Sequence, residues 1–128
     1  MIIGIGTDIV DISRMQKILE RQGDKFVSRI LSKAEQKLLR GQFTPASIAK
    51  RFAAKEAVAK SLGTGIGYGV SFQDITISND SKGAPLVNLS GGAAKVLHKK
   101  SGTDVLLSLS DERDYAIAYA VLISQRLM

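Results

Sequence analysis

The sequence predicts an α+β fold in which a mostly antiparallel sheet packs against helices. Apolar residues recur at helical spacing mainly in the first half of the chain, and they alternate as in strands mainly in the second half. The last two strand-like segments are separated by a short polar turn, as in a hairpin. Helices grouped early and strands grouped late are typical of α+β proteins. With 128 residues and no repeat or linker, we expect a single domain over residues 1–128.

The N-terminal segment predicts a strand followed by a helix. Residues 1–5 are typical of a buried strand, in which Gly4 and Gly6 let a backbone or a ligand approach closely. Asp8 is expected at the end of this strand. From Asp11 onward the apolar residues recur on one helical face. That face consists of Ile12, Met15, Ile18 and Leu19.

Two more helices are predicted before the middle of the chain. Residues 32–35 (Ser-Lys-Ala-Glu) have the form of a capping box, so a helix should begin there and run to about Arg40, where Gly41 ends it. Thr44-Pro45 is a typical helix start, and the helix that follows should extend to Leu62.

The second half predicts strands and one short helix. In chain order we expect strands over residues 71–78 and 85–89, a helix over residues 93–100, and strands over residues 105–110 and 115–124. Residues 79–83 and residues 111–114 are polar turn segments that separate the strands of each pair.

The composition excludes several classes of protein. Hydrophobic residues make up 45%, which argues against disorder, and no apolar run approaches the roughly 20 residues of a membrane-spanning helix. Without cysteine there is no disulfide or thiolate metal site, and a single histidine, His98, excludes most zinc sites. The N-terminus has no basic region of the kind that begins a signal peptide, so we expect a cytoplasmic location.

The net charge of +6 predicts an acidic or phosphorylated partner, such as nucleic acid, an anionic cofactor, an acidic protein or a lipid surface. A non-enzymatic nucleic-acid-binding module is therefore one hypothesis. However, aromatic residues make up only 5% and include no tryptophan, so few side chains are available to stack on nucleic-acid bases. No nucleic-acid-binding motif is recognisable either. This hypothesis also leaves Asp8 and Glu56 without a purpose.

The segment RFAAKEAVAKSLGTGIG, residues 51–67, carries the candidate chemistry. Glu56 and Lys60 are four residues apart and share a helix face, so one interpretation is an exposed ion pair worth a few tenths of a kcal/mol. The other is a phosphate and metal site, because the glycines at 63–67 would let backbone N–H groups approach a phosphate. That loop follows the helix C-terminus, the unfavourable end of the dipole for an anion, so cations such as Lys60 would have to compensate.

Asp8 offers a second carboxylate for such a site. Two carboxylates with substrate phosphate oxygens and water are a usual arrangement for Mg²⁺, a small hard ion that keeps part of its hydration shell. The metal would neutralise charge on a pyrophosphate while basic side chains hold its oxygens. Because Asp8 and Glu56 are far apart in the sequence, their convergence is a prediction for the structure to test.

These segments resemble a known family. Residues 4–10 (GIGTDIV) resemble the N-terminal signature of the holo-[acyl-carrier-protein] synthases, and residues 51–57 (RFAAKEA) through Lys60, with the loop at 62–67 (LGTGIG), resemble the second signature. The resemblance covers essentially the whole chain in order. Further agreement comes from Phe72 with Asp74, from Asn79-Asp80 with Gly83 and Pro85, and from residues 110–113 (SDER) with Tyr115-Ala116.

The resemblance implies the 4'-phosphopantetheinyl transferase fold and a Mg²⁺-dependent enzyme of fatty acid biosynthesis. Such enzymes move 4'-phosphopantetheine from coenzyme A, the co-substrate, to a serine of apo acyl carrier protein and release adenosine 3',5'-bisphosphate. The catalytic residues implied are Asp8 and Glu56, which coordinate the metal, and Lys60, which contacts the phosphates. Lys60 also competes with a water for the role of base. Arg51 and the loop Gly63-Thr64-Gly65, with Lys60, are implied to bind coenzyme A.

The first predicted helix carries Arg14, Lys17 and Arg21 on one face. Such a face is either solvated or a docking surface, and the resemblance implies docking of the acidic acyl carrier protein. Attraction of that kind mainly raises the association rate and weakens with salt.

The family assembles as a trimer with active sites between protomers, so we expect a homotrimer. The small residues Ala116, Ala118 and Ala120 suit close packing between protomers, but an ordinary core explains them equally well. Many relatives have a histidine where this chain has Leu106. In the family this histidine is linked with the adenosine phosphate end of coenzyme A, so this chain differs from the family pattern there. His98, on the short helix, is expected to be a surface or half-buried residue and not a substitute.

Overall fold

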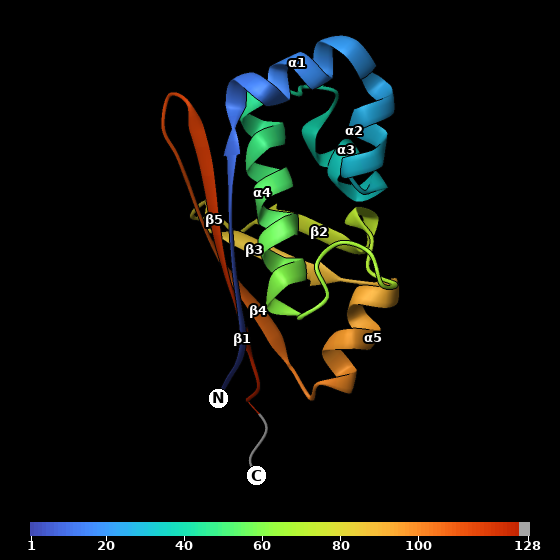
Figure 1. Cartoon of the computed structure of the whole chain (residues 1–128), viewed down its shortest axis with the longest axis vertical. Helices are drawn as coiled ribbons and strands as arrows, with labels where there is room; N and C mark the ends of the chain where they lie inside the picture. The colour runs from blue at the N-terminus through green and yellow to red at the C-terminus, as the bar shows by residue number, and fades with distance from the viewer. Residues whose placement is uncertain (126–128) are drawn as a thin grey trace.

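The computed structural model describes residues 1–125 and confirms the α+β fold, which is built around one long helix, α4 (Figure 1). A three-stranded antiparallel sheet, in the order β1-β5-β4, packs against this helix, and a separate hairpin of β2 and β3 also contacts it. The elements are β1 (Ile2–Asp11), α1 (Ile12–Gln22), α2 (Asp24–Ile30), α3 (Lys33–Leu39), α4 (Pro45–Ser61), the 3₁₀ turn η1 (Phe72–Asp74), β2 (Ile75–Asn79), β3 (Pro85–Leu89), α5 (Gly91–Lys99), β4 (Asp104–Asp111) and β5 (Tyr115–Ile123). Within residues 1–125, no helix has the length and apolar character needed to cross a bilayer.

The central strand β5 alternates small and large side chains. Its alanines at 116, 118 and 120 are fully buried on the face that packs against α4, whereas Ile117 and Tyr119 are exposed on the other face. Because alanine adds little bulk above the sheet, the helix can lie close to the strands. These alanines therefore belong to the core of this chain, which decides between the two explanations left open for them.

Gly4 and Gly6 of β1 bring the strand even closer to α4. A Cβ atom on Gly4 would lie 2.0 Å from the carbonyl oxygen of Ser61, and one on Gly6 would lie 2.0 Å from that of Ala57. The prediction of a close approach is confirmed, and the approaching group is the α4 backbone. Asp8 is the next residue on the same face of the strand, since side chains alternate with a period of two.

The structure confirms the predicted starts of α1, α3 and α4. Asp11 caps α1 by accepting hydrogen bonds from the backbone N–H groups of Ser13 and Arg14, and α3 has the expected capping box between Ser32 and Glu35. Helix α4 begins at Pro45, as predicted. Strands β3, β4 and β5 lie within one residue of their predicted positions.

The extent of β1 and the position of β2 were predicted wrongly. Strand β1 continues to Asp11, because β5 pairs with it along its length, and Asp8 lies inside the strand opposite Ala118 and not at its end. Strand β2 begins only at Ile75, because η1 precedes it, with Asp74 accepting a hydrogen bond from the Ser71 N–H.

One helix was not predicted, and another begins earlier than expected. Helix α2 buries Phe26, Val27 and Ile30, but it has no side-chain cap that would announce its start. Helix α5 begins at Gly91 and not at residue 93, since a glycine in its first turn lets it touch the loop between α4 and η1. A Cβ atom on Gly92 would lie 1.7 Å from the Gly69 carbonyl oxygen.

Candidate active site

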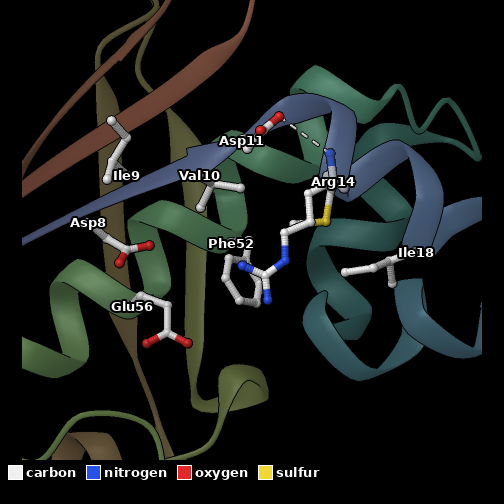
Figure 2. Close-up of a pocket in the computed structure, with 9 residues that line it drawn as sticks. Asp8, Ile9, Val10, Asp11, Arg14, Ile18, Phe52 and Glu56 are labelled. Carbon is white, nitrogen blue, oxygen red and sulfur yellow. Dashed lines mark hydrogen bonds between the residues drawn. The ribbon is translucent and has the colours of Figure 1, made fainter.

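Asp8 and Glu56 lie in one cavity of about 250 Å³ between β1, α1 and α4. Figure 2 shows the Asp8 side chain from β1 and the Glu56 side chain from α4 on the same side of the helix, with Phe52 and Arg14 beside them. The convergence predicted from two distant segments is therefore present in the structure.

The spacing of residues on the two elements explains this convergence. On α4, Phe52, Glu56 and Lys60 follow one another at intervals of four and share a face. On β1, Gly6 allows the helix to lie against the strand, so Asp8, two residues later, emerges beside the turn that carries Glu56 and Lys60.

Lys60 contacts Asp8 and not Glu56. Its ammonium nitrogen Nζ donates a hydrogen bond to the Thr7 carbonyl oxygen at 2.9 Å and lies 3.2 Å from Asp8 Oδ1. Among residues 1–125, no ion pair joins Glu56 to Lys60. The interpretation of these two residues as an exposed i, i+4 ion pair is therefore wrong.

The electrostatics of Glu56 favour a cation in this cavity. Burial raises the pKa of the Glu56 carboxyl, the negative charge of Asp8 raises it further, and the positive charge of Lys60 offsets part of the effect. A cation bound by both carboxylates would relieve the repulsion between them. Within the described residues no three acidic, histidine or cysteine side chains gather at one point, so the chain offers two carboxylates. Two carboxylates leave coordination positions for phosphate oxygens and water, which suits Mg²⁺.

Arg51 lies on a different side of α4. It lines a second cavity of about 210 Å³, with Lys50, Pro85 and Asp111, and this cavity shares no lining residue with the Asp8 and Glu56 cavity. The Arg51 side chain is 13% exposed, and its Nε lies 3.5 Å from the buried carboxylate of Glu35. Burial lowers the pKa of Arg51, and Glu35 offsets part of this. Within one chain the structure does not bring Arg51 together with Asp8 and Glu56.

The loop Gly63-Thr64-Gly65 uses its backbone N–H groups to end α4. The Gly63 N–H donates to the carbonyl oxygen of Lys60, and the N–H groups of Thr64 and Gly65 donate to that of Ala59. The expected cradle of free N–H groups for a phosphate is therefore not formed. Lys100 lies beside this loop, and its Nζ would lie 2.7 Å from a Cβ atom on Gly63.

The basic face of α1 adjoins the cavity of Asp8 and Glu56. Arg14, Lys17 and Arg21 are all exposed and line one shallow hollow together with Ile18 and Glu20. Arg14 and Ile18 also line the cavity that contains Asp8 and Glu56, so the two hollows adjoin each other. A partner bound to this face would lie at the entrance to the carboxylate site.

The remaining candidates lie elsewhere. Leu106 is 54% exposed on β4, and His98 is exposed on α5, as expected for a surface residue. The sequence interpretation missed Phe52 as a cavity wall, although its position four residues before Glu56 was a usable signal. It also missed that Lys55 is buried beside Glu35. The capping box predicted the place of Glu35 at a helix start, but not its contact with a lysine of another helix.

Comparisons with known proteins identify the family. The model of the 4'-phosphopantetheinyl transferase superfamily matches residues 4–120. A holo-[acyl-carrier-protein] synthase from Shewanella denitrificans is 53% identical over 122 residues, which cover 94% of this chain and 97% of that protein.

Solved structures agree with this assignment. The crystal structure of holo-[acyl-carrier-protein] synthase from Neisseria meningitidis has a TM-score of 0.87 and 43% identity, covering 95% of this chain and 98% of that one. The enzyme from Helicobacter pylori, in complex with coenzyme A, has a TM-score of 0.81 and 40% identity, covering 92% of this chain and 98% of that one. At this level of identity over nearly its whole length, the chain belongs to the 4'-phosphopantetheinyl transferase superfamily and, within it, to the holo-[acyl-carrier-protein] synthases.

Proposed function

We propose that this protein transfers 4'-phosphopantetheine from coenzyme A to a serine of apo acyl carrier protein, in the cytoplasm and in the service of fatty acid biosynthesis. The products are holo acyl carrier protein and adenosine 3',5'-bisphosphate. The observation that carries the proposal is the meeting of Asp8 and Glu56 in one cavity, with Lys60 bonded to Asp8, in a chain of this family. The binding of coenzyme A by the Helicobacter pylori relative supports the choice of donor.

Asp8 and Glu56 are the residues that would hold Mg²⁺. When bound, the ion would supply positive charge to the pyrophosphate of coenzyme A. Lys60 is half-exposed at the same site, and its ammonium already donates to Thr7 and faces Asp8. Because these contacts use the protons of a charged ammonium, we assign Lys60 to phosphate binding and the removal of the serine proton to a water molecule.

The positions of the remaining ligand residues favour a site shared between two copies of the chain. Gly63 lies twelve residues after Arg51, just beyond the end of α4, and the two residues face different surroundings. At the helical rise per residue, this spacing corresponds to a separation of about 18 Å. One nucleotide end would not reach both in a single copy. We therefore propose that Arg51 of one copy completes the site formed by Glu56, Lys60 and the loop Gly63-Thr64-Gly65 of another.

The outer face of the main sheet supports an assembly of copies. Its large apolar residues, on all three strands, are 44% to 60% exposed. They are Ile5, Ile9, Leu106, Ile117 and Tyr119. A contiguous apolar face of this kind is typical of a protein–protein contact. We propose that it is buried in a homotrimer.

Mixing two inactive variants tests the shared site. Arg51→Ala and Glu56→Gln should each be inactive alone, whereas equal amounts reassembled together should regain roughly a quarter of the wild-type activity, since that fraction of contacts pairs two intact halves. If the mixture stays inactive although mass measurements show that the copies exchange, both residues act within one copy.

The basic face of α1 is proposed to dock the acyl carrier protein. Arg14, Lys17 and Arg21 would attract its acidic surface and hold it beside the cavity of Asp8 and Glu56. This arrangement brings the acceptor serine to the donor phosphates.

Intact-mass measurement tests the proposed activity. The protein is incubated with coenzyme A, Mg²⁺ and apo acyl carrier protein, and the carrier protein is then weighed. We expect a gain equal to one phosphopantetheine group, and EDTA should prevent it. Binding of nucleic acid without any mass gain would instead support a basic binding module.

A further inference from the structure

Helix α4 contains a fully buried lysine directly before the proposed metal ligand Glu56. The Lys55 side chain is 0% exposed, and its Nζ donates to the carbonyl oxygens of Ile30 at 2.7 Å and Phe72 at 3.0 Å. Its third hydrogen bond goes to Glu35 Oε1, on a side chain that is also 0% exposed. All three donor positions of the ammonium are therefore used, and they connect α4 to α2, α3 and η1.

Glu35 extends the same network. Its Oε1 also accepts a hydrogen bond from the Ser32 N–H at 2.9 Å, as part of the capping box, and its Oε2 accepts one from the Ile77 N–H at 3.2 Å. Arg51 Nε faces Oε2 at 3.5 Å. One carboxylate thus holds two basic side chains of α4 and is itself fixed to α3 and β2.

A pair of this kind is an inefficient way to stabilise a core. Removing both charges from water costs nearly as much as their attraction returns, and apolar side chains of similar volume often stabilise a core at least as well. The pair does, however, supply directional contacts that the rest of the α4 core face lacks. That face is mostly alanine, which interlocks little with its neighbours: Ala49, Ala53, Ala54, Ala57 and Ala59.

We propose that the Glu35–Lys55 pair positions the Glu56 carboxylate by fixing the rotation of α4 about its axis. The proposal rests on the proposed function, in which Glu56 and Asp8 bind one metal ion. Side-chain atoms lie about 5–6 Å from a helix axis, so a rotation of about 10° moves a carboxylate by about 1 Å. A misplacement of about 1 Å can cost about 10²-fold in rate. Lys55 directly precedes the metal ligand Glu56 in the chain, and Glu35 contacts Lys55. Both are thus positioning residues that act on Glu56 through α4.

Metal binding by Lys55→Met tests the proposal without turnover. Calorimetric titration of Mg²⁺ into the variant saturated with coenzyme A should show an affinity at least about 10-fold weaker than wild type. kcat should fall by about 10- to 100-fold. The KM for acyl carrier protein should stay near the wild-type value, because the basic face of α1 is not changed.

Ile48→Ala is the matched control. Ile48 is fully buried on the same helix, two turns from Lys55, and its truncation should lower Tm without removing a contact of the Glu35–Lys55 pair. At a temperature where both variants are folded, Ile48→Ala should keep the wild-type affinity for Mg²⁺. Equal affinities in wild type, Lys55→Met and Ile48→Ala would show that the pair is merely structural and would overturn the proposal.

Glu35→Gln provides the second variant if Lys55→Met does not fold. Glutamine can keep the capping box with Ser32 but removes the charge that holds Lys55. We expect the same loss of Mg²⁺ affinity, and wild-type affinity in this folded variant would overturn the proposal. If the wild-type protein itself neither binds Mg²⁺ nor modifies the carrier protein, the proposed function fails and the positioning role falls with it. If the wild type does both, only the variants decide.

Discussion

Replacing Gly6 with alanine should push α4 away from β1 and pull the proposed metal site apart. The added Cβ atom would lie 2.0 Å from the Ala57 carbonyl oxygen, 2.7 Å from the Ser61 backbone nitrogen and 2.9 Å from Lys60 Cβ. Ordinary contact begins at 3.4 Å, so the nearest pair must separate by 3.4 − 2.0 = 1.4 Å. Two of the three obstacles are backbone atoms of a helix, which cannot rotate aside.

Two consequences follow from this displacement. Overpacking by one methyl group typically costs about 1–3 kcal/mol, and the rigid backbone places Gly6→Ala at the upper end, with a loss of roughly 10 °C in Tm. Since Asp8 is on the strand and Glu56 is on the helix, their separation should change by about 1 Å, enough to reduce the transfer rate by about 10²-fold.

Calorimetry and steady-state kinetics measure both effects. Thr7→Ser is the control, because Thr7 is the next residue on the opposite face and the serine keeps the hydroxyl that donates to the Ala118 carbonyl oxygen. A Gly6→Ala protein with the Tm and the transfer rate of wild type would refute the explanation of how β1 and α4 assemble the site.

Two further predictions concern the charged residues around the cavity. Lys17→Glu or Arg21→Glu should raise the KM for acyl carrier protein several-fold, most strongly at low salt, and leave the affinity for coenzyme A unchanged, because neither residue lines the cavity of Asp8 and Glu56. Kinetics at two salt concentrations would measure this, and equal loss of both would contradict docking on α1. Glu56→Gln should raise Tm at neutral pH in metal-free buffer, because the pKa of Glu56 is raised in the folded state. Between the pKa of Glu56 in the unfolded protein and its higher pKa in the folded protein, the native state binds more protons than the unfolded state. Because of Glu56, the free energy of unfolding therefore falls as pH rises through this window. Glutamine does not ionise, so Glu56→Gln removes this loss of stability. Thermal unfolding from pH 4 to 7 checks this, and a lower Tm for Glu56→Gln at neutral pH would be the contrary result.

Local sequence signals predicted most of the fold. The capping box at Ser32, the Thr44-Pro45 start and the alternation in β5 each describe interactions within a few residues, and the structure contains all three. Helix α2 has no such signal, because Gly23 precedes it without a side-chain cap and its burial depends on tertiary packing. The full length of β1 depends on pairing with β5, more than a hundred residues away.

The candidate site, like the fold, was predictable from the sequence only in part. The period of two on β1 and the period of four on α4 indicate which side chains share a face, and this much of the cavity was predictable. Which partner each group takes was not. Lys60 pairs with Asp8 instead of Glu56, and the N–H groups of the Gly63 loop bond to the end of α4, because a helix terminus competes with any ligand for these donors. The position of Arg51 on another side of α4 was predictable, because five residues before Glu56 correspond to about 140° around a helix.

The central claim is that Asp8 and Glu56 together form the metal site for phosphopantetheine transfer. The measurement that tests it most directly is the transfer rate to apo acyl carrier protein, followed by intact mass, as a function of Mg²⁺ concentration for wild type, Asp8→Asn and Glu56→Gln. We predict saturable transfer by the wild type and no detectable transfer by either variant at the Mg²⁺ concentrations that saturate the wild type. Near-normal transfer by either folded variant would contradict the assignment of that carboxylate to the metal.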